Sequence, residues 1–470
     1  MDTTNFHNWL LLILYLVPLL IVRYVGKNLN LWRDDYDRFG LLFLSLMLFN
    51  LGGGTRSFVI LVFGIVFNYL MVRLMLQRQG WQAKAIAAAA IAFDIGVLVY
   101  FKYLRFFFGI GGNLLPIGIS FFTFTMVAFV VDNLSSKKKK KQQPIGFFDF
   151  ANFVAFFPNI VAGPIERKST LYNQVAGFRF KFSAEDLEIA LRWLALGLFM
   201  KFVLADNITP FINYKETANA WMVWFSAYLF TLRIYFDFAG YSFMALGLAK
   251  AFGVKLTVNF LAPYTATSIQ EFWRRWHISL NNWFRDYVFI PLMGSKKEWA
   301  EFYLFITFTL SGLWHGAAWN FVIWGAYHGL LLLILRYTSR SSGILGKRLV
   351  MPEFLSWAVT FGCVVFGSLF FMETNFGRLG QKLLTVVTPW AYSLPNISNV
   401  FSSFTANELL ALGFVLVLAN AVLLLEHLAV WQKREFAYDL LLSPWVGRVL
   451  LGLTLLLAAN TPSPFIYTSF

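Results

Sequence analysis

The sequence predicts an all-α protein that crosses a membrane many times. Hydrophobic residues make up 58% of its 470 residues and charged residues only 13%, about half of the roughly 25% that is usual in soluble domains. The apolar runs are continuous, whereas the strands of a membrane β-barrel would alternate apolar and polar residues. Because lipid admits only backbones that satisfy their own hydrogen bonds, these runs predict helices.

A spanning helix needs about 20 apolar residues, and twelve runs approach that length. They are 9–25, 40–53, 57–76, 86–103, 114–133, 187–205, 219–236, 302–317, 319–336, 355–372, 409–427 and 446–460. We read the first run as a retained span rather than a cleaved signal peptide, since no basic region precedes it.

Two other segments are expected to behave differently. Residues 147–168 are apolar but contain Pro158, Gly163 and Pro164, so we expect a bent or re-entrant segment that is buried in protein. Residues 373–408 lack a long apolar run, and we expect a loop with a short amphipathic part.

The net charge of +15 fits a membrane protein whose cytoplasmic loops collect Lys and Arg. The basic segments 77–84 and 135–143 are separated by two spans, so both can face the cytoplasm, with the N-terminus outside. The lysine run in 135–143 could instead dock to acidic lipid or an acidic protein. We find no nucleic-acid-binding signature. Cys363 is the single cysteine, so no intrachain disulfide or cysteine metal cluster is possible and no metal site is expected.

Charge is concentrated in "SIQEFWRRWHISLNNWFRDYVFIPLMG" (268–294). Ser268 and Glu271 form an S-x-x-E capping box, which predicts a helix from there to about Tyr287, before Pro291.

On that helix one face would carry Arg274, His277, Asn281 and Arg285, since they recur at steps of three and four. The face could lie at the membrane interface with its arginines reaching the headgroups, or it could line a wet cavity.

A second histidine, His315, lies near the middle of "TLSGLWHGAAWNFVIWGAYHG". Ionisable groups at such depth are costly and usually functional. The alternative is a neutral imidazole satisfied by a carbonyl or a hydroxyl, for which Ser311 is a candidate. His328 follows 13 positions later, about 220° round a continuous helix, so we expect it to face away and to play a supporting role.

The chemistry that fits these residues is general-base activation of a hydroxyl by a buried imidazole. The sequence has no metal-ligand spacing, no G-x-S-x-G elbow and no phosphate-binding loop. Asn281 or the arginines could polarise an acyl carbonyl. The pattern therefore favours acyl transfer from a thioester to an alcohol. A proton-coupled transporter or flippase is the competing class, although we find no inverted repeats.

An ordered set of motifs resembles the membrane-bound O-acyltransferase (MBOAT) family. The likeness is strongest to its bacterial branch, which serves alginate O-acetylation, cellulose acetylation and teichoic-acid D-alanylation. The motifs are "LPIGISFFTF" (115–124), "FFPNIVAGPIER" (156–167), "YFDFAGYSFMALGLAKAFG" (235–253), "NFLAPYTATSIQEFWRRWHISLNNWFRDYVFIPLMG" (259–294), "SGLWHGAAWNFVIWGAYHG" (311–329) and "PFIYTSF" (464–470).

The resemblance implies one integral-membrane domain over 1–470, with a catalytic core at about 115–335. It implies a ring of about 10–12 transmembrane helices, with re-entrant and interfacial helices, around a central tunnel. His315 of "LWHG" would be the general base and His277 its partner. Ser311, Trp314 and His328 would surround them.

Polar and charged residues of the same core would bind the donor and substrate: Arg274, Arg275, Asn281, Arg285 and, as a candidate carboxylate, Asp237. The arginines could attract the phosphates of coenzyme A.

The expected function is O-acetylation of an exported polysaccharide, such as cellulose or alginate, at the bacterial inner membrane. Acetyl-CoA would be the donor, and no bound cofactor is expected. The acceptor would be the polysaccharide or a periplasmic SGNH-type acyltransferase, beside a polysaccharide synthase complex and membrane lipid. D-alanyl transfer to teichoic acid from a carrier protein stays open as an alternative.

Overall fold

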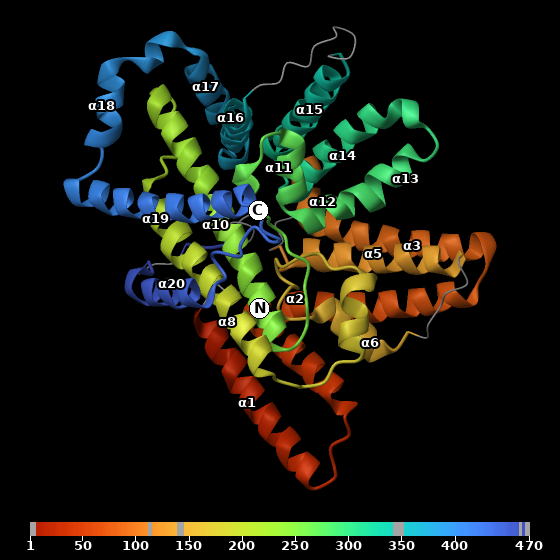
Figure 1. Cartoon of the computed structure of the whole chain (residues 1–470). Helices are drawn as coiled ribbons and strands as arrows, with labels where there is room; N and C mark the ends of the chain where they lie inside the picture. The colour runs from red at the N-terminus through yellow and green to blue at the C-terminus, as the bar shows by residue number, and fades with distance from the viewer. Residues whose placement is uncertain (1–5, 111–114, 139–144, 342–351, 460–462, 466–470) are drawn as a thin grey trace. The chain divides into compact units, whose positions relative to one another are not determined.

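The regular structure of the described residues is entirely helical (Figure 1). The computed structural model describes residues 6–110, 115–138, 145–341, 352–459 and 463–465. The predicted all-α class is therefore confirmed.

The chain folds as two compact units. One comprises Met1–Leu194 and Tyr241–Val258, and the other Ala195–Gly240 and Asn259–Phe470. The expectation of a single domain stays a prediction.

The first unit contains the N-terminal helices. These are α1 (Phe6–Asn28), α2 (Tyr36–Gln77), α3 (Gly80–Leu98), α4 (Leu104–Phe108), α5 (Ile119–Lys138), α6 (Phe147–Ala155), α7 (Asn173–Ala176) and most of α8 (Ala184–Leu198). The long helix α10 (Ala220–Ala251) starts in the second unit and ends in the first.

The second unit contains the remaining helices. These are α9 (Asp206–Ile208), α11 (Ile269–Arg275), α12 (Ile278–Phe284), α13 (Ile290–Met293), α14 (Ala300–His315), α15 (Trp319–Ser341), α16 (Glu353–Met372), α17 (Phe376–Val387), α18 (Leu394–Ser402), α19 (Ala406–Trp431) and α20 (Pro444–Leu457).

Six helices of the described residues are long and apolar enough to cross a membrane. They are Trp9–Asn28, Tyr36–Gln77, Gly80–Phe108, Trp319–Thr338, Glu353–Met372 and Ala406–Trp431; Ile119–Ser135 and Pro444–Leu457 are shorter apolar helices. The protein is thus a multi-pass membrane protein.

The two runs predicted at 40–53 and 57–76 correspond to the two helical parts of α2, which meet at a kink. Gly54 has φ 72° and ψ 162° inside α2, a conformation that glycine adopts at little steric cost. The glycine cluster of the sequence therefore marks the kink, and helix resumes directly after it.

The bent segment predicted at 147–168 is confirmed. It begins as α6, and the irregular backbone that follows is buried from Phe156 to Glu166. Its polar groups find partners inside the unit: the Phe157 N–H donates to Ser45 Oγ at 3.3 Å and the Asn159 amide donates to the Pro164 carbonyl at 3.1 Å. Such backbone is tolerated because its hydrogen bonds are made within protein.

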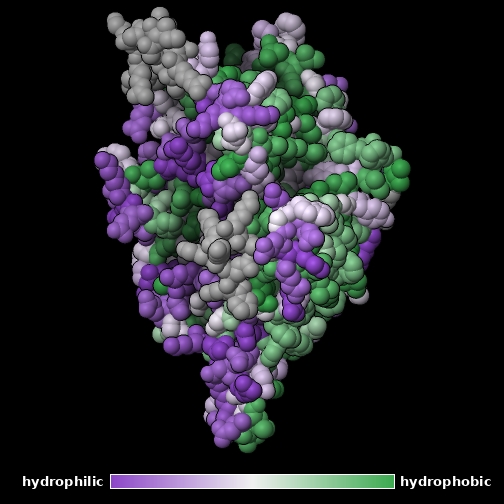
Figure 2. Space-filling view, turned by 90° about the vertical axis from the view of Figure 1, so that its right-hand side faces the viewer, coloured by the Kyte–Doolittle hydropathy of each residue, from purple (hydrophilic) through white to green (hydrophobic). Residues whose placement is uncertain are grey.

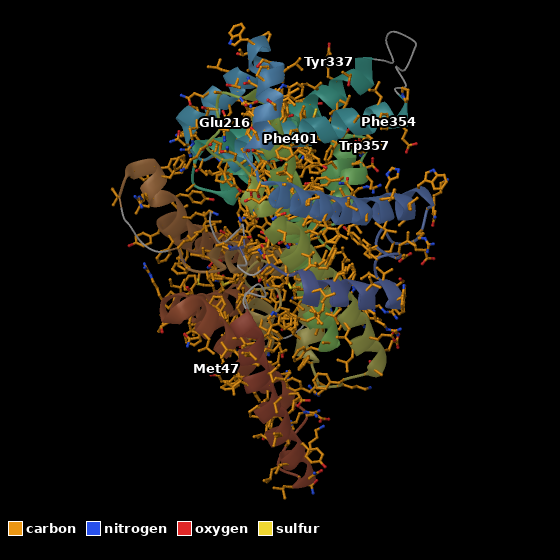
Figure 3. All side chains as sticks on the ribbon, turned by 90° about the vertical axis from the view of Figure 1, so that its left-hand side faces the viewer. Met47, Glu216, Tyr337, Phe354, Trp357 and Phe401 are labelled. Carbon is orange, nitrogen blue, oxygen red and sulfur yellow. The ribbon has the colours of Figure 1, made fainter. Side chains whose placement is uncertain are left out.

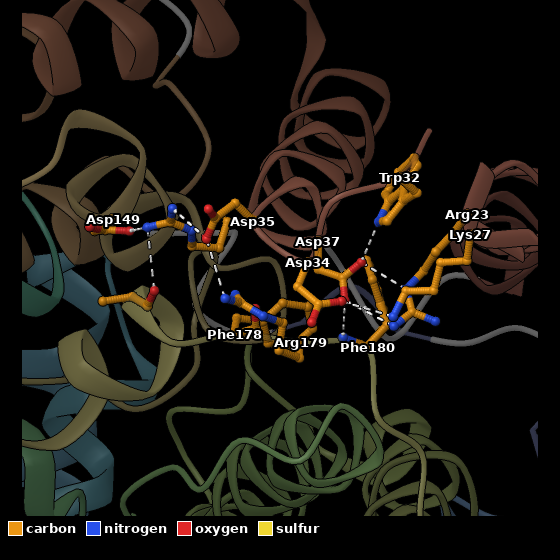
Figure 4. A network of polar contacts seen from close by, with 12 residues as sticks. Arg23, Lys27, Trp32, Asp34, Asp35, Asp37, Asp149, Phe178, Arg179 and Phe180 are labelled. Carbon is orange, nitrogen blue, oxygen red and sulfur yellow. Dashed lines mark hydrogen bonds and ion pairs between the residues drawn. The ribbon is translucent and has the colours of Figure 1, made fainter. Parts of the chain in front are cut away.

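A charged network fixes the loop between α1 and α2 (Figure 4). The buried Asp37 carboxylate accepts hydrogen bonds from Arg23 at 2.7 Å, from the Trp32 indole at 2.9 Å and from the Phe180 N–H at 3.0 Å. Hydrophilic side chains gather at this loop, at the lower end of Figure 2, while hydrophobic residues cover much of the surface above it on that face.

Residues 373–408 are more helical than expected. The predicted amphipathic part is present as α17, and α18 adds a second short helix after a 3-10 turn at Pro389–Tyr392. The buried Glu373 holds the start of this segment, since it pairs with Arg378 at 2.9 Å and with Lys382 at 2.8 Å.

Candidate active site

His315 ends a helix at the tip of the α14–α15 hairpin. After it the backbone of Gly316 is extended (φ −164°, ψ 152°), and α15 starts at Trp319. The expectation that His315 and His328 lie on one continuous helix, facing apart, is therefore wrong. The two histidines belong to separate helices, α14 and α15, which pack against each other as an antiparallel hairpin.

A pair of glycines lets α14 and α15 approach closely. A Cβ built on Gly312 would lie 2.2 Å from the Phe321 carbonyl oxygen, and one on Gly325 would lie 2.3 Å from the Phe308 carbonyl oxygen. Only glycine fits at such a backbone contact. The contact sets His315 beside the inner face of α15.

His277 lies at a break between two short helices. Its backbone is left-handed (φ 44°, ψ 54°) and separates α11 from α12. The single helix predicted from 268 to about 287 is therefore wrong, although Ser268 does cap α11 by accepting from the Glu271 N–H at 3.2 Å. Left-handed backbone is uncommon outside glycine and is held here by tertiary bonds.

Those bonds come from a preceding loop. The Ile278 N–H donates to the Asn259 carbonyl at 3.0 Å, the Ser279 N–H donates to Asn259 Oδ1 at 3.1 Å, and the Leu261 N–H donates to the Arg275 carbonyl at 3.0 Å. The loop thus pairs with the chain on both sides of His277.

Asn281 closes the break from the other side. Its side-chain amide donates to the carbonyls of Trp273 at 2.7 Å and Trp276 at 2.6 Å. These carbonyls would otherwise lack partners at the end of α11. Asn281 therefore supports the break, and its expected role in polarising an acyl carbonyl stays a prediction.

The two histidines meet in an aromatic enclosure. The ring centroids of His277 and His315 are 6.5 Å apart, and the side chains are 1% and 3% exposed. Phe238 packs edge-on against His277 at 4.6 Å, and Phe371 against His315 at 5.4 Å. Trp314 contacts both rings, at 6.0 and 5.1 Å.

Burial lowers the pKa of His277, which lies outside the six candidate spans, to about 3. The ring is therefore neutral at physiological pH, and it can accept or share a hydrogen bond without adding charge to the enclosure.

His328 lies behind a tryptophan from the histidine pair. The Trp324 ring is 5.0 Å from His315 and 4.9 Å from His328, and Trp273 lies 5.0 Å from His328 on another side. His328 is 2% exposed. This placement fits the supporting role expected for it.

A cavity of about 460 Å³ is lined by residues that include parts of α11, α12, α14 and α15. Its lining comprises Gln270, Trp273, Arg274, Ile278, Asn281, Asn282, Phe284, Arg285, Phe289, Leu304, Thr307, Phe308, Ser311 and Leu332. Ser311 stands one helical turn before His315 on α14, while neither histidine of the pair is among the lining residues.

Of the expected polar face, Arg274, Asn281 and Arg285 line this cavity, while His277 is buried behind it. Arg274 makes no ion pair or hydrogen bond within the part of the chain that the structure describes, whereas Arg285 pairs with Asp286 at 2.7 Å. The cavity thus offers one uncommitted cation, several amides and hydroxyls, and an aromatic wall. An elongated ligand with an anionic end would fit this lining.

Arg275 points elsewhere. It pairs with Glu271 at 2.6 Å and donates to Thr265 Oγ1 at 2.8 Å. It therefore ties α11 to the loop before it, and the donor-binding role expected for it stays a prediction.

Asp237 is likewise absent from the cavity lining. It pairs with the buried Lys201 at 2.7 Å, and Lys201 also pairs with Asp206 at 2.8 Å and donates to the Ser463 carbonyl at 2.9 Å. A buried pair of this kind is costly to break. The pair fixes the part of α10 whose next residue, Phe238, contacts His277. Asp237 therefore affects the site by positioning Phe238.

Sequence reasoning missed a second buried cluster behind the site. The Tyr235 hydroxyl donates to Glu426 at 2.7 Å and lies 3.1 Å from the Tyr438 hydroxyl, which accepts from the Ala262 N–H at 2.9 Å. Glu426 was the available signal, since it is an acid inside an apolar run. The cluster supports the loop that pairs with the His277 break.

The fold and the site define an integral membrane protein with a buried histidine pair beside a basic cavity. Residues 63–374 match the model of the membrane-bound O-acyltransferase family. The chain belongs to this family.

Its curated relatives are acyl-transfer proteins. A peptidoglycan O-acetyltransferase of Helicobacter pylori is 31% identical over 403 residues, which cover 77% of this chain and 76% of the relative. A protein of Pseudomonas aeruginosa named probable alginate O-acetylase is 36% identical over 376 residues, covering 73% and 69%. A teichoic acid D-alanyltransferase of Bacillus subtilis is 30% identical over 284 residues, covering 55% and 69%. The protein is therefore an O-acyltransferase, and the transporter alternative is set aside.

Proposed function

We propose that the protein moves acetyl groups from cytoplasmic acetyl-CoA through the bacterial inner membrane to an exported polysaccharide. The observation that carries the proposal is the histidine pair at 6.5 Å next to a cavity with the uncommitted Arg274. The relatives named for acetylation of peptidoglycan and alginate support a polysaccharide acceptor; cellulose is a further candidate.

In this proposal His315 is the general base. It takes the proton of the acceptor hydroxyl as that oxygen attacks the thioester carbonyl carbon. The tetrahedral intermediate then expels the thiolate, which receives the proton from the His315 imidazolium. The products are the acetyl ester and free coenzyme A. A positioned base of this kind contributes about 10²–10⁴-fold in rate.

His277 and the aromatic rings would hold His315 in place and keep bulk water away. A dry enclosure strengthens the interactions that stabilise the developing charge. Arg274, which lines the cavity from α11, would bind a phosphate of the donor, since guanidinium groups match phosphate geometry.

The acceptor arrives from the opposite face of the membrane in this scheme. It is either the polysaccharide itself, delivered beside its synthase complex, or a serine on a periplasmic SGNH-type acyltransferase. Both present a hydroxyl to His315, so the chemistry in the membrane is the same.

Radiolabelled acetyl-CoA offered to the purified protein with a hydroxyl acceptor tests the proposal. We expect labelled ester that forms only with the acceptor and at a rate that rises with acetyl-CoA concentration. If acetyl-CoA gives no labelled ester but a D-alanyl carrier protein does donate its acyl group, the proposal is replaced by D-alanyl transfer. That is the activity named for the Bacillus subtilis relative.

A further inference from the structure

A second and larger cavity lies in the second unit, away from the histidine pair. It has a volume of about 770 Å³, within the range of about 300–1,000 Å³ usual for ligand sites. Its lining comprises Tyr228, Tyr264, Thr265, Thr267, Glu353, Phe354, Trp357, Phe361, Asn420, Leu423, Leu424, His427 and Trp431. It is flanked by α16 and α19, with Tyr228 of α10 and Tyr264 at its floor. The proposed acyl transfer uses none of these residues.

The position of the cavity suits a ligand that enters from the bilayer. Its two flanking helices are both among those able to span the membrane. Lining residues at its mouth are well exposed: Phe354 is 74%, Trp431 72% and Leu424 56% exposed. Phe354 and Trp357 lie next to each other on α16, with ring centroids 5.6 Å apart (Figure 3). In a membrane, lipid tails would surround these exposed side chains. The apolar walls of the cavity offer water few hydrogen-bond partners, so they favour an apolar ligand.

One end of the cavity is charged. Glu353 is the first residue of α16, and α19 ends at Trp431, shortly before Lys433 and Arg434. The end of α19 is held by a tight turn, in which Lys433 has φ 52° and the Arg434 N–H donates to the Ala429 carbonyl at 3.0 Å. Glu353 and Trp431 both line the cavity, and Lys433 and Arg434 follow Trp431 by two and three residues. Trp357 and Trp431 are tryptophans of the kind that gather at membrane interfaces.

We propose that this cavity binds one phospholipid with a zwitterionic headgroup. An acyl chain would lie along Phe361, Leu423 and Trp357. The lipid phosphate would meet Lys433 and Arg434, and the ammonium group would meet Glu353. A carboxylate in the lining and two cations just beyond the last lining residue of α19 favour a zwitterionic headgroup over an anionic one.

The bound lipid would brace the segment that carries the donor cavity. The N–H of Thr267, in the lining, donates to the Glu271 carboxylate at 2.8 Å, and the Thr265 hydroxyl accepts from Arg275 at 2.8 Å. Trp273 and Arg274 of the same short helix face the donor cavity. The lipid site does not depend on the proposed donor or acceptor.

Lipid retention tests the proposal. Wild-type protein purified from bacterial membranes is passed through gel filtration in detergent, and its phospholipid is quantified by mass spectrometry. Leu423→Trp fills the cavity, and Asn420→Trp fills it from a more exposed position in case the first variant folds poorly. Leu410→Trp is the matched control, because Leu410 is on the same helix, 72% exposed and outside the lining.

We expect wild type and Leu410→Trp to retain a stoichiometric amount of phospholipid and both cavity-filling variants to lose most of it. Phosphatidylethanolamine added back to delipidated wild type should bind more tightly than phosphatidylglycerol, and Glu353→Gln should remove that preference. Equal retention in the filled variants, no retained lipid in wild type, or a preference for phosphatidylglycerol would overturn the proposal.

Discussion

At residue 277 the backbone conformation is as informative as the side chain. A left-handed residue other than glycine costs about 1–2 kcal/mol, and such outliers cluster where function constrains the chain. The hydrogen bonds from Asn259 on one side and Asn281 on the other hold this conformation. A histidine kept at a strained turn, against a second buried histidine, indicates a functional position.

Asparagine tolerates left-handed backbone better than most residues, so His277→Asn should fold while removing the imidazole. We expect kcat for acetyl transfer to fall about a hundredfold, as for a misplaced catalytic group, with KM for acetyl-CoA unchanged. Steady-state kinetics on protein of normal thermal stability would show this. A raised KM with normal kcat would mean that His277 serves donor binding instead.

Arg274 is the residue through which the donor hypothesis is tested most simply. Arg274→Ala should raise KM for acetyl-CoA about tenfold or more, because a charged hydrogen bond contributes about 1.5–3 kcal/mol, and should leave kcat nearly unchanged. The exposed Lys215→Ala is the matched control, since Lys215 lies outside the cavity.

Acetyl-pantetheine, which lacks the nucleotide phosphates, sharpens that comparison. Wild type and Arg274→Ala should use it equally well. An equal loss with both donors would contradict a phosphate contact at Arg274.

At the scale of elements, the α14–α15 hairpin delivers His315 to the site. Gly325→Ala would place a Cβ 2.3 Å from the Phe308 carbonyl oxygen, so α14 and α15 must separate, at a cost of about 1–3 kcal/mol. We expect a lower melting temperature and a lower acetyl-transfer rate.

Gly362→Ala on α16 provides the control, since nothing lies within 4 Å of the added Cβ and alanine favours a helix over glycine. This variant should be as stable as wild type or more so. Equal stability of Gly325→Ala and Gly362→Ala would show that the close approach of α14 and α15 is not required.

The link between Glu271, Thr267 and Arg275 gives α11 a pH dependence. Burial raises the pKa of Glu271, but hydrogen bonds from the Thr267 N–H and hydroxyl and from Arg275, with the charge of Arg275, outweigh it and lower the pKa below 4.5. A lowered pKa means that the stabilisation is present above the unfolded-state pKa and is lost as pH falls below about 4.5.

Thermal melts at pH 7 and pH 4 of wild type and Glu271→Gln test this link. We expect wild type to be more stable than the variant at pH 7 and the difference to shrink at pH 4. A difference that stays constant with pH would show that the charge of Glu271 contributes nothing.

For the whole molecule, local sequence pattern predicted many of the helices and some of their breaks, such as the bend in 147–168 and the division between 302–317 and 319–336. The apolar runs marked α1, α15, α16 and α19 because length and hydropathy are local properties. The break at His277 depends on tertiary hydrogen bonds, and the close packing of α14 against α15 depends on the Gly312–Gly325 contact. Neither can be predicted from the periodicity of the local sequence.

The sequence predicted part of the site, because some of its residues stand out locally and others are placed by tertiary structure. His315 and His277 were singled out as scarce ionisable groups in apolar sequence, and the structure brings them together. Arg274 and Arg275 are neighbours that sequence reasoning treated alike, yet one lines the cavity and the other ties α11 to its loop. Side-chain direction after a helix break cannot be predicted from spacing.

The central claim is that His315 activates a hydroxyl arriving from one face against a thioester arriving from the other. The most direct measurement uses proteoliposomes that hold a hydroxyl acceptor inside and receive radiolabelled acetyl-CoA outside, with orientation checked by protease. Wild type should acetylate the enclosed acceptor, and His315→Ala, inserted to the same extent, should lose at least about a hundredfold in rate. Acetylation of the enclosed acceptor by His315→Ala at the wild-type rate would contradict the claim.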